Sequence, residues 1–405
     1  MSGPIQPGSP SPYSHSSNNE LQPGGNSPSM SSQSEASEVV KKMEQISQPA
    51  LGQPSPSTPL SPSSKNHKIS ASDKAPPLSL SPVSSDKVPS LDLSRLEKEP
   101  IRNIIGGAKE FIVWAKNNPN ISNQIVQLDF SNCLDIQESE VEDLCRLCPH
   151  LQHLNLSGCS QITDTALAPI VQLKDLKGLC LIQCWTLTDQ SMEIISQLSN
   201  LISLDASYCS NVTNHGVESI TKLHSLQILK LGGQLNATTA ALTHISKLSE
   251  LRVLSLENWE SITGSDLQPL EGLKKLHTLN LAFCNHIIDE GRLSSLTQMK
   301  ALTSLKLRGV PINGVDLSYL VHTCKMLAEL DLAYCYKLSK DDFSSLTNLR
   351  ELTKLSLVGT SINDEVLGKL ASLSKLVHLD VFDCPNITNN GLEPFSGREG
   401  LKVLS

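Results

Sequence analysis

The sequence is poor in aromatic side chains, which make up 3% of its 405 residues. With so few large rings, its core must be built mainly from Leu, Ile and Val. The sequence also lacks an excess of basic charge, because 33 Lys and Arg oppose 41 Asp and Glu, giving a net charge of −8. Dedicated nucleic-acid-binding proteins usually carry a basic excess or a basic stripe, so we predict no nucleic-acid partner.

Long apolar runs are missing as well. No stretch approaches the roughly 20 apolar residues that a membrane-spanning helix needs. The first 22 residues are rich in Ser, Pro and Gly and show no apolar core of a secretory signal. Without a route into an oxidising compartment, the eleven cysteines are predicted to be reduced thiols in a cytoplasmic protein. The alternative is a protein exported into a host cytoplasm.

The sequence shows no catalytic motif: it has no G-x-S-x-G nucleophile turn, no Walker phosphate loop and no carboxylate pair outside its repeats. One segment, Cys145-x-x-Cys148-Pro-His150-x-x-His153, gathers four residues of types that bind zinc. Its spacing matches no standard zinc site. We therefore predict that the protein is not an enzyme and holds no metal or cofactor.

Two regions differ sharply in composition. Sixteen of the 23 prolines lie in the first 100 residues, and serine fills most of the remaining positions there. Such a segment cannot bury enough apolar surface to offset its chain entropy, so residues 1–98 are predicted to be disordered. Residues 99–124 contain a helix-like apolar set and are predicted to form an N-terminal cap on the region that begins at residue 125.

From residue 125 to residue 405 the sequence repeats itself. The pattern L-x-x-L-x-L-x-x-C recurs every 24–26 residues, which is far beyond chance. It defines eleven complete units and the opening strand of a twelfth. The units begin at Ile125, Leu151, Leu176, Leu201, Leu226, Leu251, Leu276, Leu302, Leu327, Leu352, Leu376 and Leu401.

One unit, residues 151–175, shows the structure that each repeat predicts. Leu154 and Leu156 alternate as in a short strand, and Thr163 is a good helix N-cap. Apolar residues at helical spacing come next, so each unit reads as strand, turn, helix and return. The sequence therefore predicts an α/β solenoid, with parallel strands lining a concave side and helices lining a convex side.

The repeat resembles the cysteine-containing leucine-rich repeat (LRR) of F-box/LRR substrate receptors, which belong to cullin–RING ubiquitin ligases. The resemblance is carried by Leu151-Gln-His-Leu154-Asn-Leu156-Ser-Gly-Cys159-Ser-Gln-Ile162-Thr163-Asp164 and its equivalents across residues 125–405. It implies a curved LRR horseshoe and a role in ubiquitin-dependent protein catabolism. The predicted cap at residues 99–124 is too short to hold an F-box. The resemblance therefore does not extend to direct docking to an SCF-type ligase.

Seven cysteines stand at the ninth position of the repeat: 133, 159, 184, 209, 284, 335 and 384. Identical placement within the repeat favours a structural ladder of buried thiols over metal or redox chemistry. Val310 and Thr360 replace the cysteine in two units with shorter turns. The unit that begins at Leu226 lacks the Ile-Thr-Asp turn, and a looser loop is predicted there from Gly232, Gly233, Gln234 and Asn236.

The concave face is the predicted partner-binding surface. In each strand the side chains at positions three, five and seven point away from the core. Exposed aromatic residues often anchor protein partners. The predicted partner-binding residues are Asp205, Tyr208, Lys230, Asn280, Phe283, Lys306, Arg308, Asp331, Tyr334, Asp380 and Phe382.

Two features of this face have other interpretations. The rings at position eight, Tyr208, Phe283 and Tyr334, are equally expected to pack against neighbouring turns. Lys306 and Arg308 lie one repeat before Glu329 and Asp331. The two sets are therefore expected to pair across adjacent strands.

Three functions fit these observations. The first is a protein-interaction scaffold that binds a partner on the concave face. The second, implied by the resemblance, is substrate recognition for a ubiquitin ligase, with an adaptor as an additional partner. The third is a secreted bacterial effector that targets host proteins. The start of the chain is rich in Ser and Pro and its first acidic residue is Glu20, so it resembles a type III secretion leader. The strand at residues 401–404 also predicts self-association through its unpaired edge.

Overall fold

The computed structural model describes residues 107–405 except residue 235 and residues 288–291. The chain divides into two units, residues 1–85 and Asp86–Ser405, and all described residues belong to the second. The predicted disordered region at 1–98 lies outside the described residues, as does the beginning of the predicted cap at 99–124. Both bounds therefore stay predictions.

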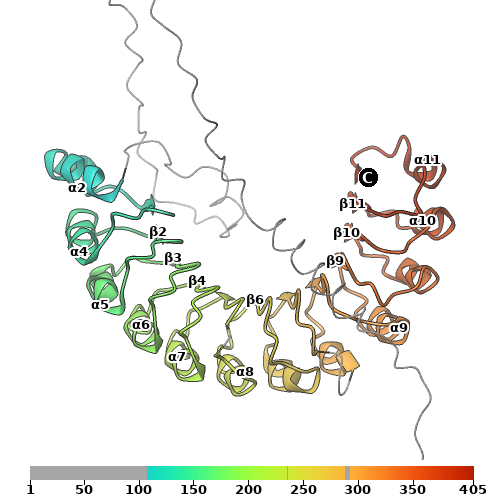
Figure 1. The fold of residues 1–405 in the computed structure, drawn as a ribbon, viewed down its shortest axis with the longest axis horizontal. Coiled ribbons are helices and arrows are strands. Elements are labelled where there is room, and N and C mark those ends of the chain that lie inside the picture. The colour runs from blue at the N-terminus through green and yellow to red at the C-terminus, as the bar shows by residue number, and fades with distance from the viewer. Residues whose placement is uncertain (1–106, 235, 288–291) are drawn as a thin grey trace, which may run out of the picture. The chain divides into compact units, whose positions relative to one another are not determined.

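The described residues form one leucine-rich-repeat solenoid, as predicted. Twelve short strands pair in parallel in sequence order, in a single sheet (Figure 1). Each strand covers positions three to five of its repeat, except for β12, which lies one residue earlier. The strands are β1 (Gln127–Asp129), β2 (His153–Asn155), β3 (Gly178–Cys180), β4 (Ser203–Asp205), β5 (Ile228–Lys230), β6 (Val253–Ser255), β7 (Thr278–Asn280), β8 (Ser304–Lys306), β9 (Glu329–Asp331), β10 (Lys354–Ser356), β11 (His378–Asp380) and β12 (Lys402–Leu404).

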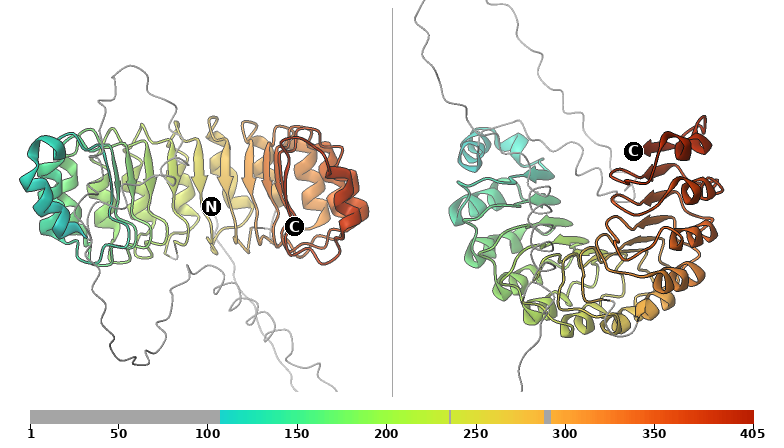
Figure 2. Two further views of the ribbon diagram at one scale, coloured as in Figure 1. Left: turned by 90° about the horizontal axis from the view of Figure 1, so that it is seen from above. Right: turned by 45° about the vertical axis from the view of Figure 1, so that its right-hand side comes forward.

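Helices return the chain from each strand to the next and line the outer side of the solenoid, while the strands line its inner, concave side (Figures 1 and 2). The α-helices are α2 (Ala108–Asn117), α3 (Pro119–Ser122), α4 (Glu138–Leu147), α5 (Asp164–Leu167), α6 (Asp189–Ile195), α7 (Asn214–Ile220), α8 (Ala240–Ile245), α9 (Gly314–Thr323), α10 (Asp364–Leu370) and α11 (Asn389–Leu392). The 3₁₀ helices are η2 (Ala168–Gln172), η3 (Ser265–Gly272), η4 (Arg292–Gln298), η5 (Asp342–Asn348) and η6 (Glu393–Phe395).

Five of the return segments contain 3₁₀ helix where the repeat pattern predicts an α-helix. Three of these five segments contain a proline. Pro169 lies at the start of η2, where α5 ends, Pro269 lies inside η3, and Pro394 lies in η6. Proline has no backbone N–H and cannot continue an α-helical hydrogen-bond ladder, so the return tightens at these residues.

Helix α2 packs over the first repeat. It begins directly after Gly107 and buries Phe111 and Ile112. The Phe111 ring meets the Phe130 ring edge-on, with 5.4 Å between centroids. These contacts cover the apolar end of the first repeat, as a solenoid terminus requires.

The Thr and Asp positions of the repeat turn link neighbouring units at three places among the described residues. Thr188 caps α6 by accepting a hydrogen bond from the backbone of Gln190. The same threonine donates its backbone N–H and its hydroxyl to the two carboxylate oxygens of Asp164, one repeat earlier, at 2.9 and 2.6 Å. Thr213 repeats both contacts with Asp189. The motif therefore begins a helix and also stabilises the stacking of neighbouring repeats.

Six of the seven position-nine cysteines form the predicted ladder, and the prediction is wrong for Cys133, which is half-buried and donates its thiol to Asp135 at 2.7 Å. Each thiol from Cys159 onward lies 3.0–3.2 Å from the carbonyl oxygen at position six of the preceding repeat. Cys184, for example, donates to Leu156. These small side chains fill the corner after the strand and give the carbonyl a second donor besides the backbone N–H of its own turn.

Two other side chains continue the ladder where cysteine is missing. Gln234 is buried and donates through its Nε2 to the Ala206 carbonyl at 2.6 Å. Trp259 is fully buried and donates through its indole N–H to the Leu231 carbonyl. The expectation of a looser loop in the Leu226 unit is therefore wrong at Gln234, which keeps the ladder intact.

We expect the buried ladder thiols to resist modification. Burial raises the pKa to about 12 for Cys159, Cys184, Cys209, Cys284 and Cys335. At about pH 8 these thiols stay protonated, and the thiolate is the reactive form. A titration with Ellman's reagent should leave all five unmodified in the native protein and detect all eleven cysteines after unfolding. Rapid reaction of all eleven in the native state would contradict a buried ladder.

No helix among the described residues has both the length and the apolar composition that crossing a membrane requires.

Candidate functional site: the concave face

The aromatic residues at position eight pack against the next turn. Tyr208, Phe283 and Tyr334 all have a left-handed backbone with φ of 57–60°, and each is followed one repeat later by a glycine. A Cβ on Gly233 would lie 2.3 Å from Cδ1 of Tyr208, so the ring lies directly on this glycine. Phe283 lies on Gly309, and Tyr334 on Gly359, in the same way. These rings therefore support the turns, whatever their outer edges bind.

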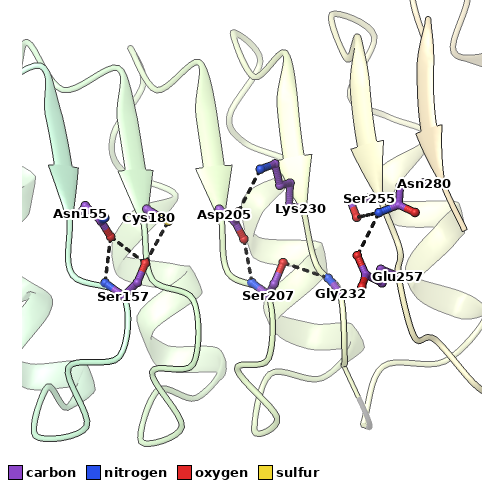
Figure 3. Close-up of polar contacts among 10 residues, drawn as sticks. All are labelled: Asn155, Ser157, Cys180, Asp205, Ser207, Lys230, Gly232, Ser255, Glu257 and Asn280. Carbon is purple, nitrogen blue, oxygen red and sulfur yellow. Dashed lines mark hydrogen bonds and ion pairs between the residues drawn. The ribbon is translucent and has the colours of Figure 1, made fainter. Parts of the chain in front are cut away.

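A row of polar side chains crosses the concave face at positions five and seven (Figure 3). At its N-terminal end, Asn155 accepts two hydrogen bonds from Ser157, at 3.0 Å from the backbone N–H and 2.6 Å from the hydroxyl. The Ser157 hydroxyl also lies 3.0 Å from the Cys180 thiol on the next strand. These contacts hold small polar groups close to the sheet.

The middle of the row is charged. Lys230 on β5 lies 3.3 Å from the carboxylate of Asp205 on β4 (Figure 3). Asp205 is almost buried, whereas the Lys230 side chain is 42% exposed. Beside them, burial raises the pKa of Tyr208, and the carboxylates of Glu257 and Asp205 raise it further. The tyrosine hydroxyl therefore stays protonated and can donate a hydrogen bond.

At Gly232 the row of polar residues has no side chain. Its backbone N–H donates to the Ser207 hydroxyl at 3.2 Å, and a Cβ there would lie 3.2 Å from the Glu257 carbonyl oxygen. Beyond it, Asn280 donates to Ser255 at 3.1 Å and to Glu257 at 3.0 Å (Figure 3). The polar groups are thus paired across strands along the inner side of the sheet.

In the C-terminal half of the face, the predicted cross-strand pairing is confirmed for Arg308 and wrong for Lys306. Arg308 lies 3.3 Å from Asp331, as expected. Glu329 pairs with Lys354 on the following strand, at 2.5 Å, and not with Lys306. Burial alone would raise the pKa of Glu329, but Lys354, Ser304 and Lys306 together bring it below its usual range. Lys306 itself is exposed and makes no ion pair within the described part of the chain.

Two further contacts complete the face. The Arg308 guanidinium lies over the Tyr334 ring, 5.4 Å from its centroid, so the ring and Asp331 fix its position together. Asp380 accepts a hydrogen bond from the Phe382 backbone at 3.2 Å, and the Phe382 ring is 61% exposed.

The two cysteines and two histidines of the zinc-like segment do not point toward a common site. Cys145 is buried in α4, Cys148 caps that helix, and the His150 ring lies 3.0 Å from Asp175. His153 belongs to β2 on the concave side. Over the described ranges, no three His, Cys, Asp or Glu side chains are grouped so that they could hold a metal ion.

Sequence reasoning missed the structural roles of three kinds of residue. Gln234 and Trp259 stand 25 and 50 residues after Cys209, so strict counting would have placed both in the ladder. The glycines under the rings could have been found in the same way, because Gly233 follows Tyr208 by one repeat. Trp259 is fully buried, whereas Trp185 lies at the surface beside a turn and is 56% exposed.

Comparison with known proteins supports the repeat assignment. The family model described as Leucine Rich repeat matches residues 147–171, 272–294 and 372–396. A search of curated proteins finds no match.

Among solved structures, the chain is similar to an internalin, InlF, from Listeria monocytogenes, with 19% identity and a TM-score of 0.41 over 77% of this chain and 92% of that one. It is similar to TLR13 in a complex with ssRNA13, with 22% identity and a TM-score of 0.47, over 69% of this chain and 40% of that one. It is also similar to the yeast Rad7 and Elc1 complex, with 20% identity and a TM-score of 0.40, over 74% and 88%. These likenesses are distant.

Proposed function

We propose that this protein is an interaction scaffold that binds a protein partner through the concave face of its repeats. The observation that carries the proposal is the composition of that face. Small polar groups and cross-strand ion pairs form a continuous strip, with an exposed cation at Lys306 and an exposed ring at Phe382. Such a surface offers aromatic and charged anchors for a protein partner.

The concave face can be tested without disturbing the fold. Lys306 and Phe382 are exposed and lie outside the core, so Lys306→Ala with Phe382→Ala should fold normally. Affinity capture with the full chain, read by mass spectrometry, should lose its main partner with this double variant. A matched variant, Val113→Ala with Lys247→Ala, changes one apolar and one basic residue outside the concave face and should keep the partner. Equal capture by both variants would contradict concave binding.

The same capture tests the ubiquitin-ligase function, and an export assay tests the effector function. Substrate recognition for a ubiquitin ligase rests on the resemblance of the repeat, and it requires a cullin adaptor among the captured proteins. Its docking segment would be 101–114, which lies partly outside the described residues. The effector hypothesis requires that removal of residues 1–30 abolish export without affecting folding.

We also propose a reducing compartment, either the cytoplasm or, for an exported protein, a host cytoplasm. All eleven cysteines are free thiols, and most are buried in the ladder or in the repeat core. A thiol such as Cys184 already donates to a carbonyl of the preceding repeat, so it serves the fold in its reduced form.

A further inference from the structure

Most charged side chains in the middle of the concave face already have a partner of opposite charge. Eight charged residues stand at positions three, five and seven of the repeats from β4 to β10. Six of them form ion pairs at 2.5–3.3 Å, which are Lys230–Asp205, Arg308–Asp331 and Lys354–Glu329. The other two, Glu257 after β6 and Lys306 in β8, have no ion-pair partner among the described residues.

Glu257 is half-buried and contacts an amide where its neighbours contact a cation. Its carboxylate accepts a hydrogen bond from the Asn280 side chain at 3.0 Å (Figure 3). On the preceding repeat, Gly232 stands beside it and has no side chain to cover it. Burial raises the pKa of the Tyr208 hydroxyl nearby, and the Glu257 carboxylate raises it further. An unbalanced negative charge in this position attracts a cation that approaches the sheet.

Lys306 carries the opposite charge and is exposed on the same face. Glu329 on the following strand contacts Lys354 at 2.5 Å and Ser304 at 3.2 Å, and not Lys306. Within the part of the chain that the structure describes, the Lys306 ammonium group makes no hydrogen bond or ion pair. Its three N–H donors are therefore available to an acidic group of a ligand.

The residues between these two charges are small or already bonded. The Nδ2 of Asn280 donates to Ser255 and Glu257, at 3.1 and 3.0 Å. Its Oδ1 accepts from the Ala282 backbone at 3.0 Å, so the amide is fully used. Ser255 and Ala282 are almost buried, with 8% and 4% exposure. A chain can therefore lie close to the sheet here, with Glu257 and Lys306 as the charges that orient it.

The register of the sheet sets the spacing between the two charges. Lys306 is in register with Ser255 two strands away, and Glu257 follows Ser255 by two residues. With strands about 4.8 Å apart and residues about 3.3 Å apart along a strand, the two positions are roughly 12 Å apart. An extended chain covers about 13 Å in four residues, and side chains four residues apart point to the same side.

We propose that the concave face binds an extended segment of a partner protein, which carries a basic side chain at Glu257 and an acidic side chain four residues away at Lys306. This segment belongs to the partner of the proposed function, on which the assignment rests. Arginine suits the first position, because its planar guanidinium bonds carboxylates and stacks on rings such as the half-exposed Tyr208. Like charges at either position would be repelled, which makes the pair a source of specificity.

The test is a selection on the full chain from phage-displayed random peptides of roughly 12 residues, which span roughly 40 Å when extended. Peptides selected on the native protein should be enriched in a basic and an acidic residue four positions apart. Glu257→Lys makes both positions basic, so its peptides should carry two acidic residues. Lys306→Glu makes both positions acidic and should select two basic residues.

Neutral variants measure the contribution of each charge. Glu257→Gln keeps an acceptor for Asn280 and removes only the charge, and Lys306→Gln does the same at the other position. Fluorescence anisotropy with the most enriched peptide should show binding that is roughly two- to fivefold weaker in each, as for a single exposed ion pair. Glu260→Gln removes an exposed charge outside the concave face and should change nothing. Circular dichroism checks that each variant is folded.

Three outcomes would overturn the proposal. One is a selection on the native protein without enrichment of the charged pair, and another is the same selected peptides for the native protein and the charge variants. The third is a spacing of seven or eight residues between the two charges, which indicates a helix instead of an extended segment. If capture of a protein partner depends on Phe382 while the selected peptides ignore Glu257, the concave scaffold stands and only this assignment falls.

Discussion

Trp259→Ala is expected to lower the free energy of unfolding by about 3–5 kcal/mol, because it removes a fully buried indole from the middle of the solenoid. The indole also donates to the Leu231 carbonyl, so the variant leaves that carbonyl without its side-chain donor. Each repeat relies on its neighbours, so a defect in the sixth unit weakens stacking on both sides. Urea unfolding followed by circular dichroism measures the effect.

Two companion variants make this result specific. Trp185→Ala removes the same ring from a site that is 56% exposed and should change stability by less than about 0.5 kcal/mol. Trp259→Phe keeps most of the apolar volume but loses the N–H donor, so it should lie between Trp259→Ala and the native protein. Equal effects at Trp185 and Trp259 would show that the indole of Trp259 is not part of the ladder.

Gly309→Ala is expected to destabilise the protein by about 2–3 kcal/mol, for two separate reasons. The first is the backbone: Gly309 has a φ of +70°, where a side chain costs about 1–2 kcal/mol. The second is a steric clash. The new Cβ would lie 2.6 Å from Cδ1 of Phe283 and would displace the ring from its position on the turn. The change should appear as a lower midpoint of urea unfolding.

A double-mutant cycle separates these causes. Phe283→Ala removes the ring, so in that background Gly309→Ala should cost only the backbone term. Gly368→Ala is the matched control, since Gly368 lies in α10 with nothing within 4 Å of an added Cβ. It should stabilise the protein by about 0.5–1 kcal/mol, because alanine is the better helix former. Strict additivity at Gly309 and Phe283 would contradict the contact between ring and turn.

The repeat spacing was sufficient to establish the solenoid and its register. A core leucine at position four, such as Leu154 or Leu204, must face inward in every unit, and strict spacing then forces the parallel stacking of strands. The burial of the cysteine ladder could be predicted from the same periodicity. Such local, repeated contacts are readable in one dimension because each unit touches only its neighbours.

Only the folded structure shows which charged surface groups are free and which are already paired. Arg308 and Lys306 look alike in the sequence, yet Arg308 is held by Asp331 and Tyr334, while Lys306 has no ion-pair partner among the described residues. The return after α9 is a short 3₁₀ helix, η5, which no repeat pattern predicts. Side-chain pairing and helix type depend on distances between repeats of unequal shape, and those distances exist only once the chain has folded.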